Sequence, residues 1–175
     1  MGEAEARSYL ERGEEHLQRE EWLDAEGAFR QAVALHATSA VGWSKLGVAL
    51  ARQRRLAEAI EALRQAIQLD PRYAPAYSNL GNVYREQGQN EEAIRAYQRA
   101  IEMDPEYWIA HQNLGALYKE TGRLGEAVAE FRKATRLSMR GGRGQRRGCL
   151  FPAAAVLVLL VVGLAVAVAL VGHPP

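Results

Sequence analysis

Cysteine is almost absent from this chain, and acidic residues are absent from its C-terminal part. Cys149 is the only cysteine among 175 residues, which excludes a disulfide framework and a metal site built from several cysteines. All 21 acidic residues lie at or before Glu130. The later basic residues therefore have no acid among them; they are Arg132, Lys133, Arg136, Arg140, Arg143, Arg146 and Arg147. Such charge asymmetry predicts contact with a nucleic acid or a membrane surface.

Charged side chains are also missing from the last long segment of the chain. Residues 151–171 read FPAAAVLVLLVVGLAVAVALV. At about 1.5 Å per residue, a helix of this length spans about 31 Å, close to the ~30 Å hydrocarbon core of a bilayer. The segment is predicted to be a single transmembrane helix, followed by a short tail at 172–175. Gly163 and Ala167 in this span add the hypothesis of a weak homodimer through a small-xxx-small face.

The basic residues before the span favour a membrane over a nucleic acid, because no aromatic residues alternate with them. Residues 140–150 are predicted to be a flexible basic linker beside the membrane. Its proposed membrane-surface residues are Arg140, Arg143, Arg146 and Arg147. The positive-inside rule then places the body in the cytoplasm, which predicts a tail-anchored, single-pass membrane protein. Richness in Ala, Arg and Glu favours a bacterial plasma membrane, with a eukaryotic endomembrane as the alternative.

Before this tail, small and large residues recur at helical spacing. In residues 74–107, one helical face is formed at i, i+3, i+4 and i+7 by Tyr77, Leu80, Gly81 and Tyr84. A second face follows Gly88 and stops at Asp104-Pro105; its residues are Ala93, Ile94, Tyr97, Ala100 and Ile101. The small residues are expected where two helices approach closely. The same pattern returns after 34 residues at 40–73 and 108–141, and more faintly at 6–39.

This pattern resembles the tetratricopeptide repeat (TPR) family in its period and in its W-x2-L-G-x2-Y, A-x3-F and P residues. The resemblance implies an all-α fold: a right-handed superhelical solenoid of four helix pairs within residues 1–139, followed here by the transmembrane helix. The repeats are assigned to 6–39, 40–73, 74–107 and 108–141. Helices are expected at 4–19, 22–35, 40–53, 56–69, 74–87, 90–103, 108–121 and 124–138.

The resemblance also implies a concave groove built from the first helix of each repeat, at repeat positions 2, 5, 6, 9, 12 and 13. The groove residues expected here are Lys45, Val48, Arg52, Ser78, Asn79, Asn82, Arg85, Gln112, Asn113, Ala116 and Lys119. An Asn or Gln side chain can bond both the N–H and the C=O of an extended peptide, and Lys and Arg favour carboxylates. The carboxylate clamp of chaperone-binding family members does not fit, because its charged positions hold other residues.

An enzyme is not expected, because His16, His36, His111 and His173 are dispersed and form no converging set of catalytic groups. His111 replaces an aromatic residue inside a helix pair and is expected to be packed. No metal site or cofactor is predicted, and no nucleic acid is expected as a partner.

The sequence therefore predicts a membrane-tethered scaffold whose groove binds a peptide or helix of a partner protein. The alternatives are a structural assembly subunit of an integral membrane complex and a tail-anchored co-chaperone. The last repeat lacks a covering polar helix and carries Arg132, Lys133 and Arg136. Either it lies near anionic head groups, or these residues only set topology.

Overall fold

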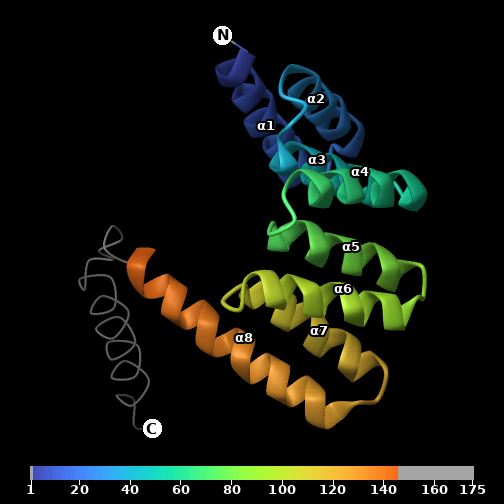
Figure 1. Cartoon of the computed structure of the whole chain (residues 1–175), viewed down its shortest axis with the longest axis vertical. Coiled ribbons are helices and arrows are strands. Elements are labelled where there is room, and N and C mark those ends of the chain that lie inside the picture. Colours follow the sequence, from blue (N-terminus) through green and yellow to red (C-terminus); the bar gives the residue numbers. More distant parts are fainter. Residues whose placement is uncertain (1, 146–175) are drawn as a thin grey trace, which may run out of the picture. The chain divides into compact units, whose positions relative to one another are not determined.

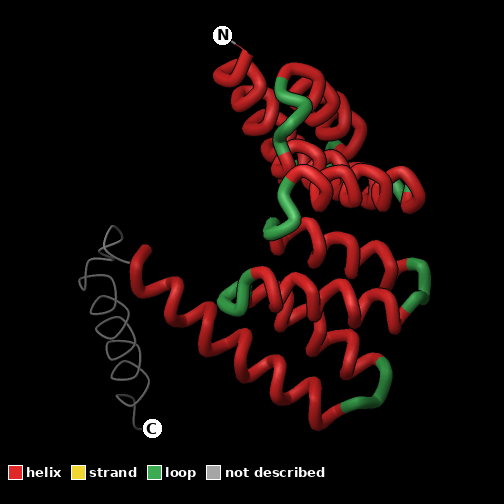
Figure 2. Tube along the Cα trace, viewed as in Figure 1, coloured by secondary structure: helices red, strands yellow, loops and turns green. Residues whose placement is uncertain are grey.

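The computed structural model describes residues 2–145, and this part of the chain is entirely helical, with no β-strand (Figures 1 and 2). The helices are α1 (Gly2–Gln18), α2 (Trp22–Leu35), α3 (Ala40–Arg52), α4 (Leu56–Leu69), α5 (Ala74–Glu86), α6 (Asn90–Met103), α7 (Trp108–Glu120) and α8 (Leu124–Gln145). Each helix begins within two residues of its predicted start, and all except α8 end within one residue of the predicted end.

Short turns with specific residues end the helices. The corners after α4 and α6 are Asx turns, in which the Oδ1 atoms of Asp70 and Asp104 accept backbone N–H groups two residues later at 2.9 and 3.0 Å. Within two of the repeats, Gly88 and Gly122 adopt positive φ angles of 74° and 78°. The corresponding residue of the second repeat is Arg54, which adopts a φ of 63° without the freedom of glycine.

The helices form antiparallel pairs that stack on one another through residue 138. In the first three repeats the first helix packs on the second helix of its own repeat, and in the last repeat Phe131 of α8 packs at Gly115 of α7. The next first helix packs on the preceding second helix, and α3, α5 and α7 also touch in succession. Buried residues from neighbouring repeats share clusters: Phe29 and Leu63 belong to one cluster and Tyr97 and Leu117 to a second, and the partly buried Tyr84 packs against both. The fold is a helical solenoid, as predicted.

The closest approach inside each pair is made at a glycine of the first helix. A Cβ built on Gly81 would lie 2.6 Å from Cε1 of Tyr97, and one on Gly47 would lie 2.7 Å from Cγ of Leu63. The Tyr97 and Leu63 side chains have no exposed surface. The large residue of the second helix therefore occupies the volume that the glycine leaves empty, as the sequence pattern indicated.

By its contacts the chain divides after Ser138 into two units, and the described part of the second unit is residues 139–145. These residues are the last turns of α8. Residues 140–145 of the predicted linker, which spans 140–150, thus belong to α8. The Asp-Pro corner that ends α4 and α6 is missing here, and Ser138 and Met139 stand in its place.

Several predictions lie outside the described residues. They are the span at 151–171 with Gly163 and Ala167, the tail at 172–175, and the surface residues Arg146 and Arg147. Within residues 2–145 no helix is both long enough and apolar enough to cross a bilayer.

Replacing Gly81 with Ala should destabilise the protein by about 1–3 kcal/mol, because the new methyl group must displace a fully buried ring. Urea unfolding followed by circular dichroism measures this change. The matched control is Gly27→Ala in α2, where a Cβ meets no atom within 4 Å. That variant should gain up to about 1 kcal/mol from helix propensity. Equal effects of the two substitutions would contradict the close-approach argument.

Candidate functional site

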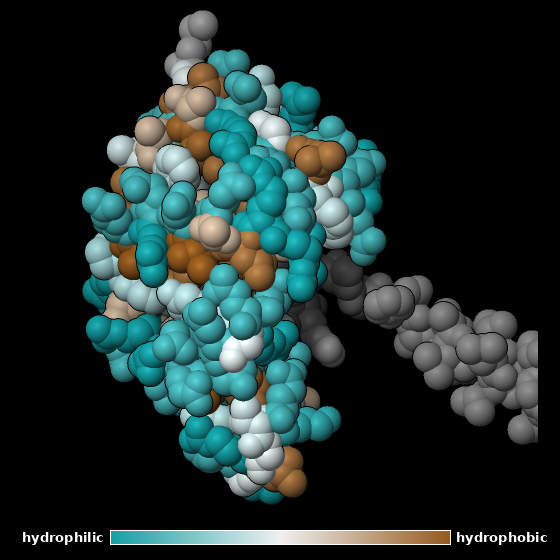
Figure 3. All heavy atoms as spheres, turned by 90° about the vertical axis from the view of Figure 1, so that its right-hand side faces the viewer, coloured by the Kyte–Doolittle hydropathy of each residue, from teal (hydrophilic) through white to brown (hydrophobic). Residues whose placement is uncertain are grey.

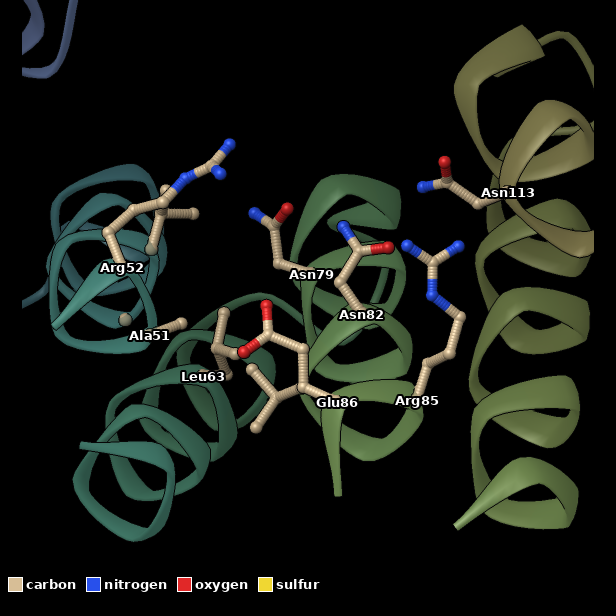
Figure 4. A pocket seen from close by; sticks show the side chains of 11 residues that line it. Ala51, Arg52, Leu63, Asn79, Asn82, Arg85, Glu86 and Asn113 are labelled. Atoms are coloured by element: carbon tan, nitrogen blue, oxygen red, sulfur yellow. The ribbon is translucent and has the colours of Figure 1, made fainter. Parts of the chain in front are cut away.

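A pocket of about 240 Å³ lies on the solenoid where α3, α5 and α7 follow one another. Arg52 reaches it from α3, Asn79, Asn82 and Arg85 from α5, and Asn113 from α7, and their polar ends point into the same opening (Figure 4). Apolar atoms of Val48, Ala51, Leu63 and Val83 also line it. The pocket thus joins three successive repeats along a polar wall.

Six of the eleven predicted groove residues line this pocket: Val48, Arg52, Asn79, Asn82, Arg85 and Asn113. Ser78 does not, because it is buried with 1% of its surface exposed. Lys45 lies outside the pocket, and its Nζ pairs with a Glu14 carboxylate oxygen of α1 at 2.7 Å. Gln112, Ala116 and Lys119 lie elsewhere on α7.

Five lining residues were missing from the sequence prediction, namely Gly47, Ala51, Leu63, Val83 and Glu86. Of these, Ala51 and Glu86 occupy positions 12 and 13 of their repeats, which the family pattern already assigns to the groove. The signal was therefore present in the sequence. Glu86 matters most, because it adds a carboxylate to a wall that was predicted to be basic; its Oε2 lies 3.2 Å from Nη1 of Arg54.

Two hydrogen bonds of the same kind connect neighbouring repeats along the wall. Asn79 Nδ2 donates to Ser44 Oγ at 3.2 Å, and Asn113 Nδ2 donates to Ser78 Oγ at 3.3 Å. Both serines are buried, with 2% and 1% of their surface exposed. Each bond uses one of the two amide hydrogens. The asparagines are therefore oriented by the preceding repeat, and each keeps a second N–H and its carbonyl oxygen for other partners.

Asn82 is oriented from within its own repeat. The Tyr97 hydroxyl donates to Asn82 Oδ1 at 2.8 Å. Burial raises the pKa of Tyr97 to about 12, so the phenol stays neutral and remains a donor at physiological pH. The amide nitrogen of Asn82 is thereby directed away from the tyrosine, and Figure 4 shows it pointing into the opening.

The cations of the wall differ in how firmly they are held. Nη1 of Arg85 lies 4.0 Å from a Glu120 carboxylate oxygen, the limit of an ion pair. Arg52 is exposed, and its guanidinium lies 5.7 Å from the ring centroid of Trp22. Neither guanidinium is clamped by a close carboxylate, so both can bind an anionic group of a ligand.

Comparisons with known proteins agree with this architecture. Residues 55–84 and 81–122 match a family model described as TPR repeat, and residues 110–138 match one described as tetratricopeptide repeat. The crystal structure of MamA is 33% identical in sequence, with a TM-score of 0.64, over 79% of this chain and 81% of that chain.

This chain belongs to the tetratricopeptide repeat family.

Two further solved TPR-like structures are similar. Pseudomonas aeruginosa PilF is 29% identical with a TM-score of 0.69, over 78% of this chain and 63% of that chain. The first TPR of Spaghetti (RPAP3), bound to the HSP90 peptide SRMEEVD, is 21% identical with a TM-score of 0.62, over 69% of this chain and 95% of that chain. The second likeness concerns the fold alone. No curated protein matches the sequence.

At the Arg52 end of the TPR wall, a buried carboxylate fixes α3 against α2. Glu26 of α2 has 7% of its surface exposed. It accepts hydrogen bonds from Arg30 at 2.9 Å, Gln53 at 2.8 Å and Arg55 at 2.7 Å. Gln53 and Arg55 lie in the turn directly after Arg52. The first two TPR units are therefore joined by a polar network beside the pocket.

Burial alone would raise the pKa of Glu26, but the hydrogen bonds from Gln53, Arg30 and Arg55 outweigh it, and the net pKa is lowered. A lowered pKa in the folded state means that the carboxylate contributes stability above its unfolded pKa. That contribution is lost as the pH falls through the folded value. The network should therefore fail in acid.

His111, the histidine that was predicted to be packed, has 1% of its surface exposed. Its Nδ1 lies 2.6 Å from Glu130 Oε2, and its Nε2 lies 3.3 Å from the Pro105 carbonyl oxygen. Both ring nitrogens thus have partners inside the last TPR unit, and neither is available to a ligand in the pocket.

In residues 2–145, one group of side chains could approach a metal ion: His16, Glu21 and Asp24, whose ligand atoms lie within 4.8 Å of one another. Both carboxylates are exposed, and His16 Nδ1 lies 2.6 Å from Glu21 Oε2. This hydrogen bond links the ends of α1 and α2 and accounts for the cluster without an ion.

Glu26→Gln should lower the free energy of unfolding by about 1–3 kcal/mol at pH 7, because three donors lose a charged acceptor. The deficit should shrink as the pH falls below the ordinary glutamate pKa of about 4.3, because the stability that the lowered pKa of Glu26 provides is lost on the way down to its folded value. Urea titrations at both pH values measure the difference. The control is Glu61→Gln at an exposed position of α4; a deficit independent of pH would contradict the assignment.

Proposed function

We propose that this TPR chain is a protein interaction scaffold that binds an extended peptide or a helix of a partner in the groove along α3, α5 and α7. The observation that carries the proposal is the pocket shared by three successive repeats, with Arg52, Asn79 and Asn113 each coming from a different helix. Groups with this spacing can contact several residues of one ligand chain.

The chemistry of the wall suits a peptide with a carboxylate. The asparagine amides retain a donor and an acceptor for backbone groups, and Arg52 and Arg85 supply donors for an acidic side chain or a free C-terminus. An open pocket of about 240 Å³ accommodates a side chain better than a whole small-molecule ligand. The first TPR of RPAP3 is itself bound to a peptide with three acidic residues, which shows that a fold of this kind can hold an acidic peptide.

We further propose that residues 151–171 hold the scaffold at the cytoplasmic face of a membrane. Support comes from the sequence, which has an uncharged stretch of bilayer length after a basic segment. Tethering raises the effective concentration of the groove near membrane-bound partners, so a modest affinity can suffice. The alternative function is a permanent assembly subunit of an integral membrane complex. Such a subunit differs from a scaffold because it copurifies with its partners at fixed stoichiometry.

The Arg52→Ala, Arg85→Ala double variant should bind acidic peptides at least about tenfold more weakly, because two charge-assisted contacts are lost. Fluorescence anisotropy with seven-residue peptides that end in a free carboxylate, one set acidic and one set basic, measures this. Arginines suit the test better than Asn79 and Asn113, whose amides also bond the buried serines and hold repeats together.

The matched control for the groove is Arg95→Ala, Arg99→Ala on α6, where both arginines pair with glutamates of their own helix. This variant should bind like the wild type. Equal loss in both double variants, or equal binding of the acidic and basic peptide sets, would count against the groove.

Removal of residues 149–175 should release the protein from membranes while its helical content is kept, because every described residue remains. Alkaline carbonate extraction of membranes, followed by immunoblotting of pellet and supernatant, measures the distribution. The full chain is expected in the pellet and residues 1–148 in the supernatant. A truncated chain that stays in the pellet would show that the tether lies elsewhere.

A further inference from the structure

The outer side of α8 exposes apolar side chains at the C-terminal end of the stack. Leu124 and Val128, one helical turn apart, have 62% and 49% of their surface exposed. Arg132 and Arg136 follow at the next two i+4 positions of α8 and are exposed. We call these four residues the α8 end face. Figure 3 shows one face of the molecule, which is mainly hydrophilic with hydrophobic bands.

The same repeat position is covered in the inner repeats. Val128 corresponds, at intervals of 34 residues, to Ile94 and Ile60. Both isoleucines are partly buried and pack against the core clusters that join neighbouring repeats. In α8 the apolar residue is retained, although no further helix pair follows it within residues 2–145.

The other end of the solenoid is built differently. On α1, the positions that hold Leu80 and Tyr84 in α5 are occupied by Arg12 and His16. A polar end face is the usual solution for a terminal repeat, since nothing covers it. The exposed apolar side chains of α8 are therefore not a general consequence of ending a stack of repeats.

The positive charge of the end face is not neutralised by the nearby acids of α8. Glu126 pairs with Arg123 at 2.6 Å, and Glu130 is engaged by His111. In α6, the positions of Arg132 and Arg136 hold Gln98 and Glu102. An apolar stripe flanked by unopposed arginines is the pattern of a helix that lies in the interface of an anionic bilayer.

We propose that the α8 end face lies on the surface of an anionic membrane, with Leu124 and Val128 at the acyl boundary and Arg132 and Arg136 at lipid phosphates. The inference rests on the proposed tether. The described part of α8 ends at Gln145, and the five residues 146–150 that precede the apolar segment reach at most about 18 Å. A membrane-embedded segment would hold the Gln145 end of α8 within that distance of the lipid.

The test uses the full chain with Cys149→Ser and a single cysteine at position 128, labelled with an environment-sensitive fluorophore. The protein is reconstituted into vesicles of phosphatidylcholine alone and of phosphatidylcholine with phosphatidylglycerol. Quenching by brominated acyl chains should appear in the anionic vesicles and weaken at high salt. The control label replaces Leu23 of α2, a leucine with 73% of its surface exposed, and should stay unquenched.

The double variant Arg132→Gln, Arg136→Gln should lower the ratio of molecules with a docked end face to molecules with an undocked one roughly thirtyfold. This follows from the usual attraction of each of the two basic residues to anionic lipid. The control variant Arg95→Gln, Arg99→Gln should leave it unchanged. Quenching that is equal in neutral and anionic vesicles, or unaffected by the Arg132 and Arg136 changes, overturns the proposal.

The outcomes separate the two ideas. A chain that floats with vesicles while the label at position 128 stays in water refutes the end-face docking alone. A chain that floats with neither vesicle type refutes the tether and the docking that depends on it. A label that is shielded by an added acidic amphipathic peptide, but not by lipid, overturns the lipid proposal in favour of a protein partner.

Discussion

The contact between a glycine of one helix and a large buried side chain of the next sets the helix-pair geometry on which the stacking of the repeats and the polar wall depend. Gly81 receives the ring of Tyr97, Gly47 receives Leu63 and Gly115 receives Phe131, always within one repeat. Because these contacts fix how closely the two helices of a pair approach, they also fix where the next pair begins. The Ser44–Asn79 and Ser78–Asn113 bonds form at the same place in successive repeats for this reason. The polar wall is thus a consequence of core packing several residues away.

The two ends of the stack differ in physical character. At the N-terminal end, polar residues replace the apolar face, and the Glu26 network joins the first two repeats by charge and hydrogen bonding. At the C-terminal end, Val128 keeps the apolar type that Ile60 and Ile94 need for contact with a following repeat. The N-terminal end therefore presents polar residues that water can solvate. The C-terminal end exposes apolar surface next to positive charge, which indicates that the surroundings of α8 differ from those of α1.

Most of the fold could be predicted because it depends on local spacing. The glycines, alanines and large residues at intervals of 34 residues specify the pairs, and the Asp-Pro corners specify where α4 and α6 end. The end of α8 could not be found in this way. Gly141 and Gly142 suggested a flexible linker, but glycine costs a helix only about 1 kcal/mol and forbids nothing. The side-chain partners could not be predicted either. Lys45 pairs with Glu14 and Asn79 bonds to Ser44 across repeats, and the side-chain orientations that make these contacts are not determined by residue type.

The pre-set orientation of the wall has a consequence for recognition. Asn79 and Asn113 are held by buried serines and Asn82 by Tyr97, so binding a peptide need not immobilise these side chains. Their amides bond backbone groups and discriminate little between sequences. Discrimination then depends on the charged side chains that line the pocket, namely Arg52, Arg85 and Glu86. If the groove binds a peptide, as proposed, a ligand carboxylate is attracted to the guanidiniums of Arg52 and Arg85, whereas Glu86 is already paired with Arg54 at 3.2 Å and opposes it less.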